Sequence, residues 1–141
     1  LQMAERVGPR GKVYAVDIQP EMLTLLAERA KSAGVTNIVP VLSAPDDPKL
    51  PPGALDLILM VDVYHELSYP EQMLAGMRAA LKESGLVALA EYRLEDPRIP
   101  IKLLHKMSKS QILKEYEANG FELARQYDEL PWQHLMFFGR R

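Results

Sequence analysis

The chain of 141 residues has a formal net charge of −2, contains no cysteine, and is 48% apolar. This composition is typical of one soluble globular domain. The missing cysteine excludes disulfides, thiolate nucleophiles and cysteine-bound metals. The sequence shows no basic excess, no apolar run of about 18 residues and no signal-peptide pattern. We therefore expect no nucleic-acid partner, no membrane partner and a cytoplasmic location.

Strand and helix signals alternate along the chain. The nearly continuous apolar run LDLILMV predicts a strand that is covered on both faces. Proline or a capping box opens each of the three main helices. The predicted elements, in chain order, are the end of a helix over 1–7, a strand over 12–16, a helix from Pro20 to Gly34, a strand over 38–42, a proline-rich loop over 43–54, a strand over 55–61, a helix from the capping box Ser68–Glu71 to Gly85, a strand over 86–90, a helix from the capping box Ser108–Gln111 to Gly120, and two strands around DELP.

This order predicts an α/β fold with a mostly parallel sheet and helices on both faces. The last two strands have no helix between them, so we expect a C-terminal antiparallel hairpin. Ligands of such sheets bind outside the carboxyl ends of the strands, and Asp17 follows the strand over 12–16. An acid at this place can accept hydrogen bonds from two ribose hydroxyls. The alternative is a helix cap or a surface acid, because Asp is common in both roles.

Four segments resemble the class I S-adenosylmethionine-dependent methyltransferases. VYAVDIQPEML is similar to the family's second strand with its ribose-binding acid, and GALDLILMVDVYHEL to its fourth strand and the segment after it. LKESGLVALAEYR resembles the fifth strand with its lead-in helix, and MSKSQILKEYEANGFEL the helix and sixth strand near the C-terminus. The resemblance spans essentially the whole chain. It implies a Rossmann-like fold and S-adenosylmethionine as the cofactor.

The family's glycine-rich loop and its central first strand have no counterpart in this chain. By the resemblance, LQMAERV corresponds to the end of the family's first helix. We therefore expect one N-terminally incomplete methyltransferase domain over residues 1–141, whose parent protein continues upstream. The alternative is a short relic that lacks half of the cofactor site.

The resemblance also implies a set of cofactor-binding residues. Asp17 would bind the ribose hydroxyls, and Ser43 stands where the family often has Asp. For the large apolar members of the set, packing in the core is the alternative interpretation. The set comprises Asp17 for the ribose, Ile18, Met22, Ser43 and Ala44 for the adenine, and Val61 and Asp62 for the methionine end.

Methyl transfer is a displacement at a carbon that the sulfonium charge already activates, so much of the catalysis is positioning. A base is needed only if the acceptor must lose a proton. His65, after the strand over 55–61, is the candidate base because its ordinary pKa suits proton transfer near neutral pH. A structural histidine is the alternative. We expect no metal, because the three histidines are far apart in sequence and no HExxH spacing occurs.

Three further features remain open. Trp132 lines an acceptor pocket or caps the sheet, and His134 faces a covering helix. His105 lies near three lysines, which form either a site for an anionic acceptor or a solvated surface. The lysines are Lys102, Lys106 and Lys109.

Two other functions compete with methyl transfer to a small-molecule acceptor. A nicotinamide-dependent oxidoreductase would also place an acid after its second strand, but a closing antiparallel hairpin is not part of the usual dinucleotide fold. A non-catalytic module that binds a partner, or forms a homodimer by strand exchange, would not need the glycine-rich loop.

Overall fold

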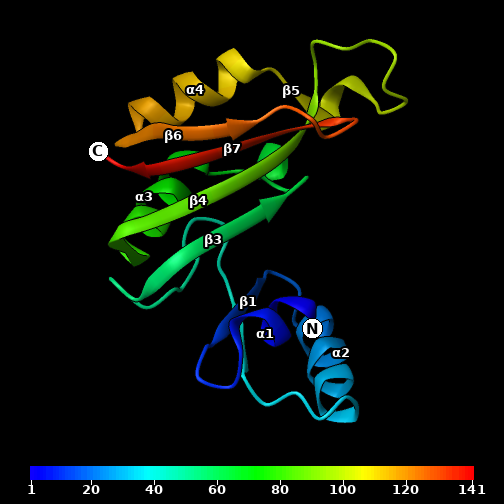
Figure 1. Ribbon diagram of the computed structural model, residues 1–141, viewed down its shortest axis with the longest axis vertical. Coiled ribbons are helices and arrows are strands. Elements are labelled where there is room, and N and C mark those ends of the chain that lie inside the picture. Colours follow the sequence, from blue (N-terminus) through cyan, green and yellow to red (C-terminus); the bar gives the residue numbers. More distant parts are fainter. The chain divides into compact units, whose positions relative to one another are not determined.

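The computed structural model describes residues 1–141. The chain divides into two compact units, Leu1–Leu50 (the N-terminal unit) and Pro51–Arg141 (the C-terminal unit), which Figure 1 shows in ribbon form. None of the helices has the length and hydrophobicity that a membrane span requires.

The N-terminal unit contains two helices and a two-stranded parallel sheet. β1 and β2 pair in register from Val13↔Ile38 to Asp17↔Leu42, so both carboxyl ends lie at the same edge. The side-chain amide of Asn37 donates hydrogen bonds to the carbonyls of Ala4 and Gly8, which fixes the end of the first helix beside the sheet. The elements are α1 (Gln2–Val7), β1 (Val13–Asp17), α2 (Pro20–Ser32) and β2 (Ile38–Leu42).

The C-terminal unit contains a five-stranded mixed sheet. Its strand order is β3-β4-β7-β6, and the short strand β5 pairs with β4. β3 and β4 are parallel, whereas β7 is antiparallel to both β4 and β6. The elements are β3 (Leu55–Val61), η1 (Tyr64–Glu66), α3 (Pro70–Ala80), β4 (Leu81–Arg93), η2 (Leu103–His105), β5 (Lys106–Met107), α4 (Lys109–Ala118), β6 (Phe121–Tyr127) and β7 (Gln133–Arg140). The predicted α/β fold with a C-terminal antiparallel hairpin is confirmed.

One hydrophobic core lies between the helices and one face of this sheet. Ile58 and Met60 of β3 pack against it, as the alternation of side chains along a strand requires. Leu57, Leu59 and Val61 point to the opposite face and are 45%, 47% and 48% exposed. The prediction that this strand is covered on both faces is therefore wrong. The core residues of α3, α4, β4 and β7 include Leu74, Met77, Ile112, Tyr116, Val87, Leu89, Met136 and Phe138.

Two predicted helix boundaries differ from the structure. α3 has Tyr69 rather than Ser68 as its N-cap, and no side chain caps it, because Pro70 occupies the first helical position. The helix ends at Ala80, not at Gly85, since Leu81 is already extended and pairs with Leu55 of β3. The predicted N-cap of α4 is confirmed: the Ser108 hydroxyl accepts a hydrogen bond from the backbone N–H of Gln111 at 3.1 Å. The reciprocal half of the capping box is not formed, because the Gln111 side chain donates to Oε1 of Glu115 instead.

Candidate active site

Asp17, the predicted ribose-binding acid, is the last residue of β1. Its Oδ1 accepts a hydrogen bond of 2.8 Å from the backbone N–H of Gln19, which holds the carboxylate at the turn into α2. Its Oδ2 has no partner within the chain and remains free to accept a further hydrogen bond. The backbone N–H of Ser43 donates to the Asp17 carbonyl at 3.0 Å, so Ser43 lies directly beside Asp17 at the edge of the sheet.

The predicted adenine residues lie on the surface of the N-terminal unit. Met22 lines an open hollow of about 420 Å³, together with Asp17 and residues of β1 and α2. Ile18 does not line this hollow. Ile18 and Met22 are 51% and 49% exposed, so packing in the core does not account for either side chain. Ala44 forms an isolated β-bridge with Asp47 just after β2.

Asp62 follows β3 with a left-handed backbone, φ 53°, which is uncommon for a residue other than glycine. Its backbone N–H donates to the Ala90 carbonyl at 2.9 Å, and its Oδ2 accepts a hydrogen bond of 3.0 Å from the side-chain amide of Gln133. Its Oδ1 is buried without any partner. A buried carboxylate oxygen needs a donor, and the ammonium group of an amino acid would supply one. Val61, immediately before Asp62, is 48% exposed.

His65 is held by a buried carboxylate. Its Nδ1 lies 2.8 Å from Oε2 of Glu91, and its backbone N–H donates to Oε1 of the same residue at 3.1 Å. Glu91 is fully buried in β4, one residue past the Val61↔Ala90 pair. Burial raises the pKa of Glu91, and the hydrogen bonds from His65 oppose this rise. With Nδ1–H donated to the carboxylate, Nε2 carries the lone pair of the imidazole.

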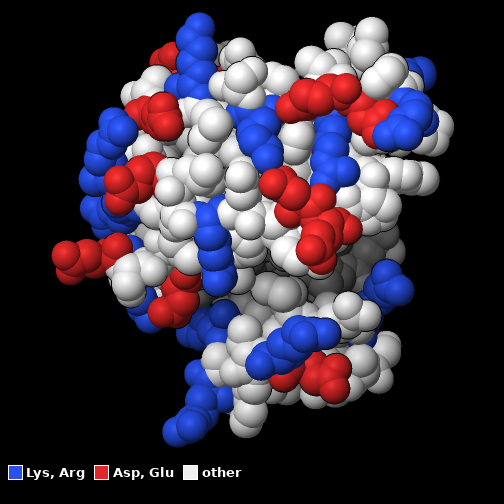
Figure 2. Space-filling view, turned by 45° about the horizontal axis from the view of Figure 1, so that its top comes forward, with Lys and Arg blue, Asp and Glu red and all other residues white.

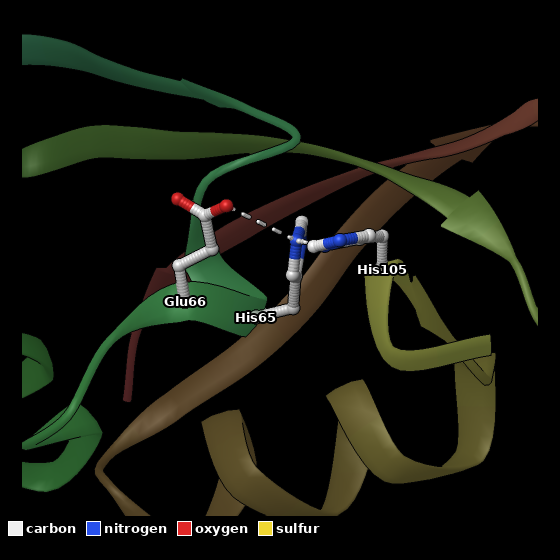
Figure 3. Close-up of side chains that lie close together, drawn as sticks. All are labelled: His65, Glu66 and His105. Carbon is white, nitrogen blue, oxygen red and sulfur yellow. Dashed lines mark hydrogen bonds and ion pairs between the residues drawn. The ribbon is translucent and has the colours of Figure 1, made fainter. Parts of the chain in front are cut away.

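The structure brings two of the three histidines together, so their separation in sequence does not exclude a metal site at this pair. Nε2 of His65 lies 3.1 Å from Nδ1 of His105 and 3.8 Å from Oε1 of Glu66 (Figure 3). The two histidine rings meet edge to face, with centroids 5.2 Å apart. The histidines are 40 residues apart in sequence, and the contact arises because η1 and η2 pack together.

Sequence reasoning missed Glu91 as a site residue. The signal for it is a single acid at the end of the buried strand segment VALAE, where an isolated charge is unfavourable without a partner. The partner, His65, is 26 residues away in sequence.

The remaining candidates lie outside this group. Nε2 of His134 bonds Oε1 of Glu95 at 3.0 Å, and Trp132 is 45% exposed. Two of the three lysines near His105 are engaged: Nζ of Lys106 donates to the Asp96 carbonyl, and Nζ of Lys109 forms an ion pair with Asp128.

Parallel strands that end in acids, followed by a closing antiparallel hairpin, define a Rossmann-like α/β protein of the nucleoside-binding class. Residues 1–87 match the family described as "Methyltransferase domain", and the chain belongs to this family.

Curated relatives carry the name ubiquinone/menaquinone biosynthesis C-methyltransferase UbiE. The proteins from Cupriavidus taiwanensis and Cupriavidus metallidurans are each 29% identical to this chain over 89 residues. The match covers 63% of this chain and 36% of either relative. The chain therefore spans about a third of the length of the relatives it matches.

Solved structures share the fold. A SAM-dependent methyltransferase from Aquifex aeolicus has a TM-score of 0.90 at 24% identity, over 99% of this chain and 74% of that one. The trans-methyltransferase CalH, in complex with SAH, has a TM-score of 0.72 at 15% identity, over 92% and 43% of the two chains. The [4+2]-cyclase SpnF also has a TM-score of 0.72, at 20% identity, over 90% and 49%. A cyclase among these neighbours means that the fold alone does not fix the reaction.

Proposed function

We propose that the chain transfers a methyl group from S-adenosylmethionine to a small-molecule acceptor that loses a proton in the reaction. One observation carries this proposal: buried Glu91 lies 2.8 Å from Nδ1 of His65. A carboxylate that orients an imidazole in this way is a recurrent arrangement for a general base.

His65 is the proposed base, and Glu91 is its positioning residue. The cofactor supplies an electrophilic methyl carbon on a sulfonium. The acceptor's electron pair forms the new bond to that carbon, and the old carbon–sulfur bond breaks with its electrons going to sulfur. Nε2 of His65 takes the acceptor's proton, and the imidazolium that forms is stabilised by the Glu91 carboxylate beside Nδ1. Because Glu91 fixes the tautomer, Nε2 holds its lone pair before the acceptor arrives.

The predicted cofactor contacts belong to this proposal residue by residue. Asp17 accepts hydrogen bonds from the ribose hydroxyls through the oxygen that the chain leaves free. Asp62 meets the ammonium group of the methionine end through its unpartnered Oδ1. The exposed apolar side chains of Ile18 and Met22, with Ser43 and Ala44, contact the adenine. Val61 contributes its backbone beside Asp62.

The acceptor class that we propose is a phenol or hydroquinone ring. The curated relatives are named for C-methylation in quinone biosynthesis. Loss of a phenolic proton makes both the oxygen and the ring carbons more nucleophilic, which is the step that a base assists. Positive and negative side chains are interspersed over the face in Figure 2, and no continuous basic area is visible there. This supports a small acceptor over a nucleic acid. A cytoplasmic location is part of the proposal.

The test is methyl transfer from radiolabelled S-adenosylmethionine to a panel of phenols and hydroquinones. We expect labelled product from the wild-type chain and a loss of kcat by about 10²–10⁴-fold in His65→Gln, as for removal of a general base. Tyr69→Phe, which alters an exposed residue just before α3, serves as the matched control. An unchanged rate in His65→Gln would exclude the base. Binding of S-adenosylhomocysteine without turnover on any acceptor would favour the non-catalytic module.

A further inference from the structure

His65, Glu66 and His105 form a three-residue cluster at the junction of η1 and η2. Figure 3 shows the two imidazole rings meeting edge to face, with the Glu66 carboxylate turned toward His65. One ligand atom from each residue lies within 4.8 Å of the other two. Two of these distances are 3.1 Å, between the histidine nitrogens, and 3.8 Å, between Nε2 of His65 and Oε1 of Glu66.

These distances suit a transition metal. Zinc binds histidine nitrogen and carboxylate oxygen at about 2.0–2.2 Å, which places tetrahedral ligand atoms about 3.3 Å apart. The two distances in the cluster lie on either side of this value, and the third pair, between Glu66 and His105, lies within 4.8 Å. Two imidazoles and one carboxylate also match the ligand preference of zinc and its borderline neighbours rather than that of calcium or magnesium.

Glu91 supplies an independent observation in favour of a metal. Histidines that bind metals usually donate their second ring N–H to a carboxylate or carbonyl, which fixes the tautomer and raises ligand basicity. Fully buried Glu91 takes this position at Nδ1 of His65 and also accepts the His65 backbone N–H. The lone pair of Nε2 is thereby directed at the space that Glu66 and His105 border. Nearby Lys106 is engaged elsewhere, with the Asp96 carbonyl.

We propose that His65 Nε2, His105 Nδ1 and a Glu66 carboxylate oxygen bind one divalent transition-metal ion of the zinc type, with Glu91 as the positioning residue. Three protein ligands leave the fourth tetrahedral position open for water or an anionic ligand. The ion would occupy the same Nε2 lone pair that the proposed base uses. Metal binding and proton transfer by His65 are therefore mutually exclusive states of one site. The binding itself requires neither cofactor nor acceptor.

The test is titration of the chelator-treated full chain with Zn²⁺ by calorimetry and with Co²⁺ by visible absorption. We expect one equivalent of either ion, with the intense bands of tetrahedral Co²⁺. His105→Gln and Glu66→Gln change exposed ligands and should abolish the tight equivalent while circular dichroism stays unchanged. Glu91→Gln should weaken Zn²⁺ binding by about 10- to 100-fold, as expected for a residue behind a ligand.

Lys102→Gln is the matched control, because it removes a charge next to η2 and leaves all four residues intact. It should retain one equivalent with unchanged affinity. Two results would overturn the proposal. The first is no stoichiometric binding to the wild-type chain. The second is one equivalent that persists with unchanged affinity in His105→Gln.

Discussion

The side chains of Asp62 and Gln133 are joined by a hydrogen bond of 3.0 Å, across 71 residues of sequence. The bond ties the end of β3 to the start of β7 through one carboxylate oxygen, while the other oxygen stays buried and unpartnered. An unpartnered polar group of this kind lowers stability, and a ligand that pairs with it recovers the loss.

Asp62→Asn should therefore separate stability from cofactor binding. A neutral amide is less costly to bury than a carboxylate, and Asn tolerates a left-handed backbone. We expect the free energy of unfolding to rise by about 1 kcal/mol and the affinity for S-adenosylmethionine to fall. Thermal unfolding and calorimetry measure the two effects. Asp56→Asn, at an exposed acid of β3 that pairs with Lys82, is the control. Unchanged cofactor affinity in Asp62→Asn would contradict the role of Asp62.

Asp17→Asn should weaken binding of S-adenosylhomocysteine at least about tenfold, since hydrogen bonds to a charged acceptor contribute about 1.5–3 kcal/mol each. The amide oxygen can still accept from the Gln19 N–H, so the turn into α2 should be preserved. Isothermal titration calorimetry measures the affinity. Asp46→Asn, at an exposed residue of the following loop, should bind as wild type does. Equal affinities in the two variants would remove Asp17 from the site.

Tyr64→Phe should destabilise the C-terminal unit by about 1.5 kcal/mol, the contribution of a hydrogen bond to a charged group. Tyr64 is 2% exposed, and its hydroxyl donates to Oε2 of Glu115 at 2.6 Å. Burial and the bond to Glu115 both raise the pKa of Tyr64, so the hydroxyl stays protonated as the donor. Urea denaturation measures the loss. Exposed Tyr69, changed to Phe, should alter stability by less than about 0.5 kcal/mol.

Tyr116→Phe should have the opposite effect. The Tyr116 ring stacks on Phe138 at 4.2 Å between centroids, but its hydroxyl is buried with no partner. Replacing it by hydrogen removes an unsatisfied polar group and keeps the stack, so we expect a gain of about 1 kcal/mol. The same urea experiment measures both tyrosine variants. A loss of stability would show that a bound water satisfies the hydroxyl.

In Glu95→Gln the free energy of unfolding should fall less steeply at acid pH than in the wild type. Partial burial alone would raise the pKa of Glu95, but the hydrogen bonds from the Lys109 backbone N–H and from His134 outweigh it and hold the pKa below its ordinary value of 4.5. A carboxyl with a lowered folded pKa stabilises above its unfolded pKa, and this stabilisation is lost as the pH falls through the folded pKa.

At pH 7 the free energy of unfolding of the wild type should exceed that of Glu95→Gln by less than about 1 kcal/mol, because the Glu95 carboxylate is half exposed. The difference should shrink as the pH falls below 4.5. Urea unfolding across this range, with exposed Glu122→Gln as the control, measures it. A difference independent of pH would place the effect outside the ionisation of Glu95.

The order of the main helices and strands and both strand-end acids could be predicted because they depend on local patterns, whereas the short β5 and the two 3-10 helices were not predicted. Asp17 and Asp62 each follow a short apolar run, and the strand period marks that run from sequence alone. The Ser108 N-cap of α4 is likewise a local signal. Two adjacent signals competed before α3, where Pro70 fixed the first helical position and made Tyr69 the cap.

The features that could not be predicted depend on contacts between distant segments. α3 ends where it does because Leu81 pairs with Leu55 of β3. The helical spacing of apolar residues gives no sign of this pairing. The cluster around His65 needs Glu91 and His105, at separations of 26 and 40 residues. A single sequence carries no trace of such proximity. The exposed face of β3 could not be predicted for a similar reason. Apolar residues on both faces of a strand show that each face can be buried, but not that another segment packs on it.

The two units differ greatly in how much they bury. Among the apolar side chains of Leu1–Leu50 outside proline, only Ala4 and Ala30 are buried, whereas the C-terminal unit holds every member of the hydrophobic core. Local opening free energies follow buried apolar contacts, and ligand-binding regions are usually drawn from the low end of that range. The amides of β1 and β2 should therefore exchange with solvent far faster than those of β4 and β7. A nucleoside bound at Asp17 would then slow exchange mostly in the segment that holds it.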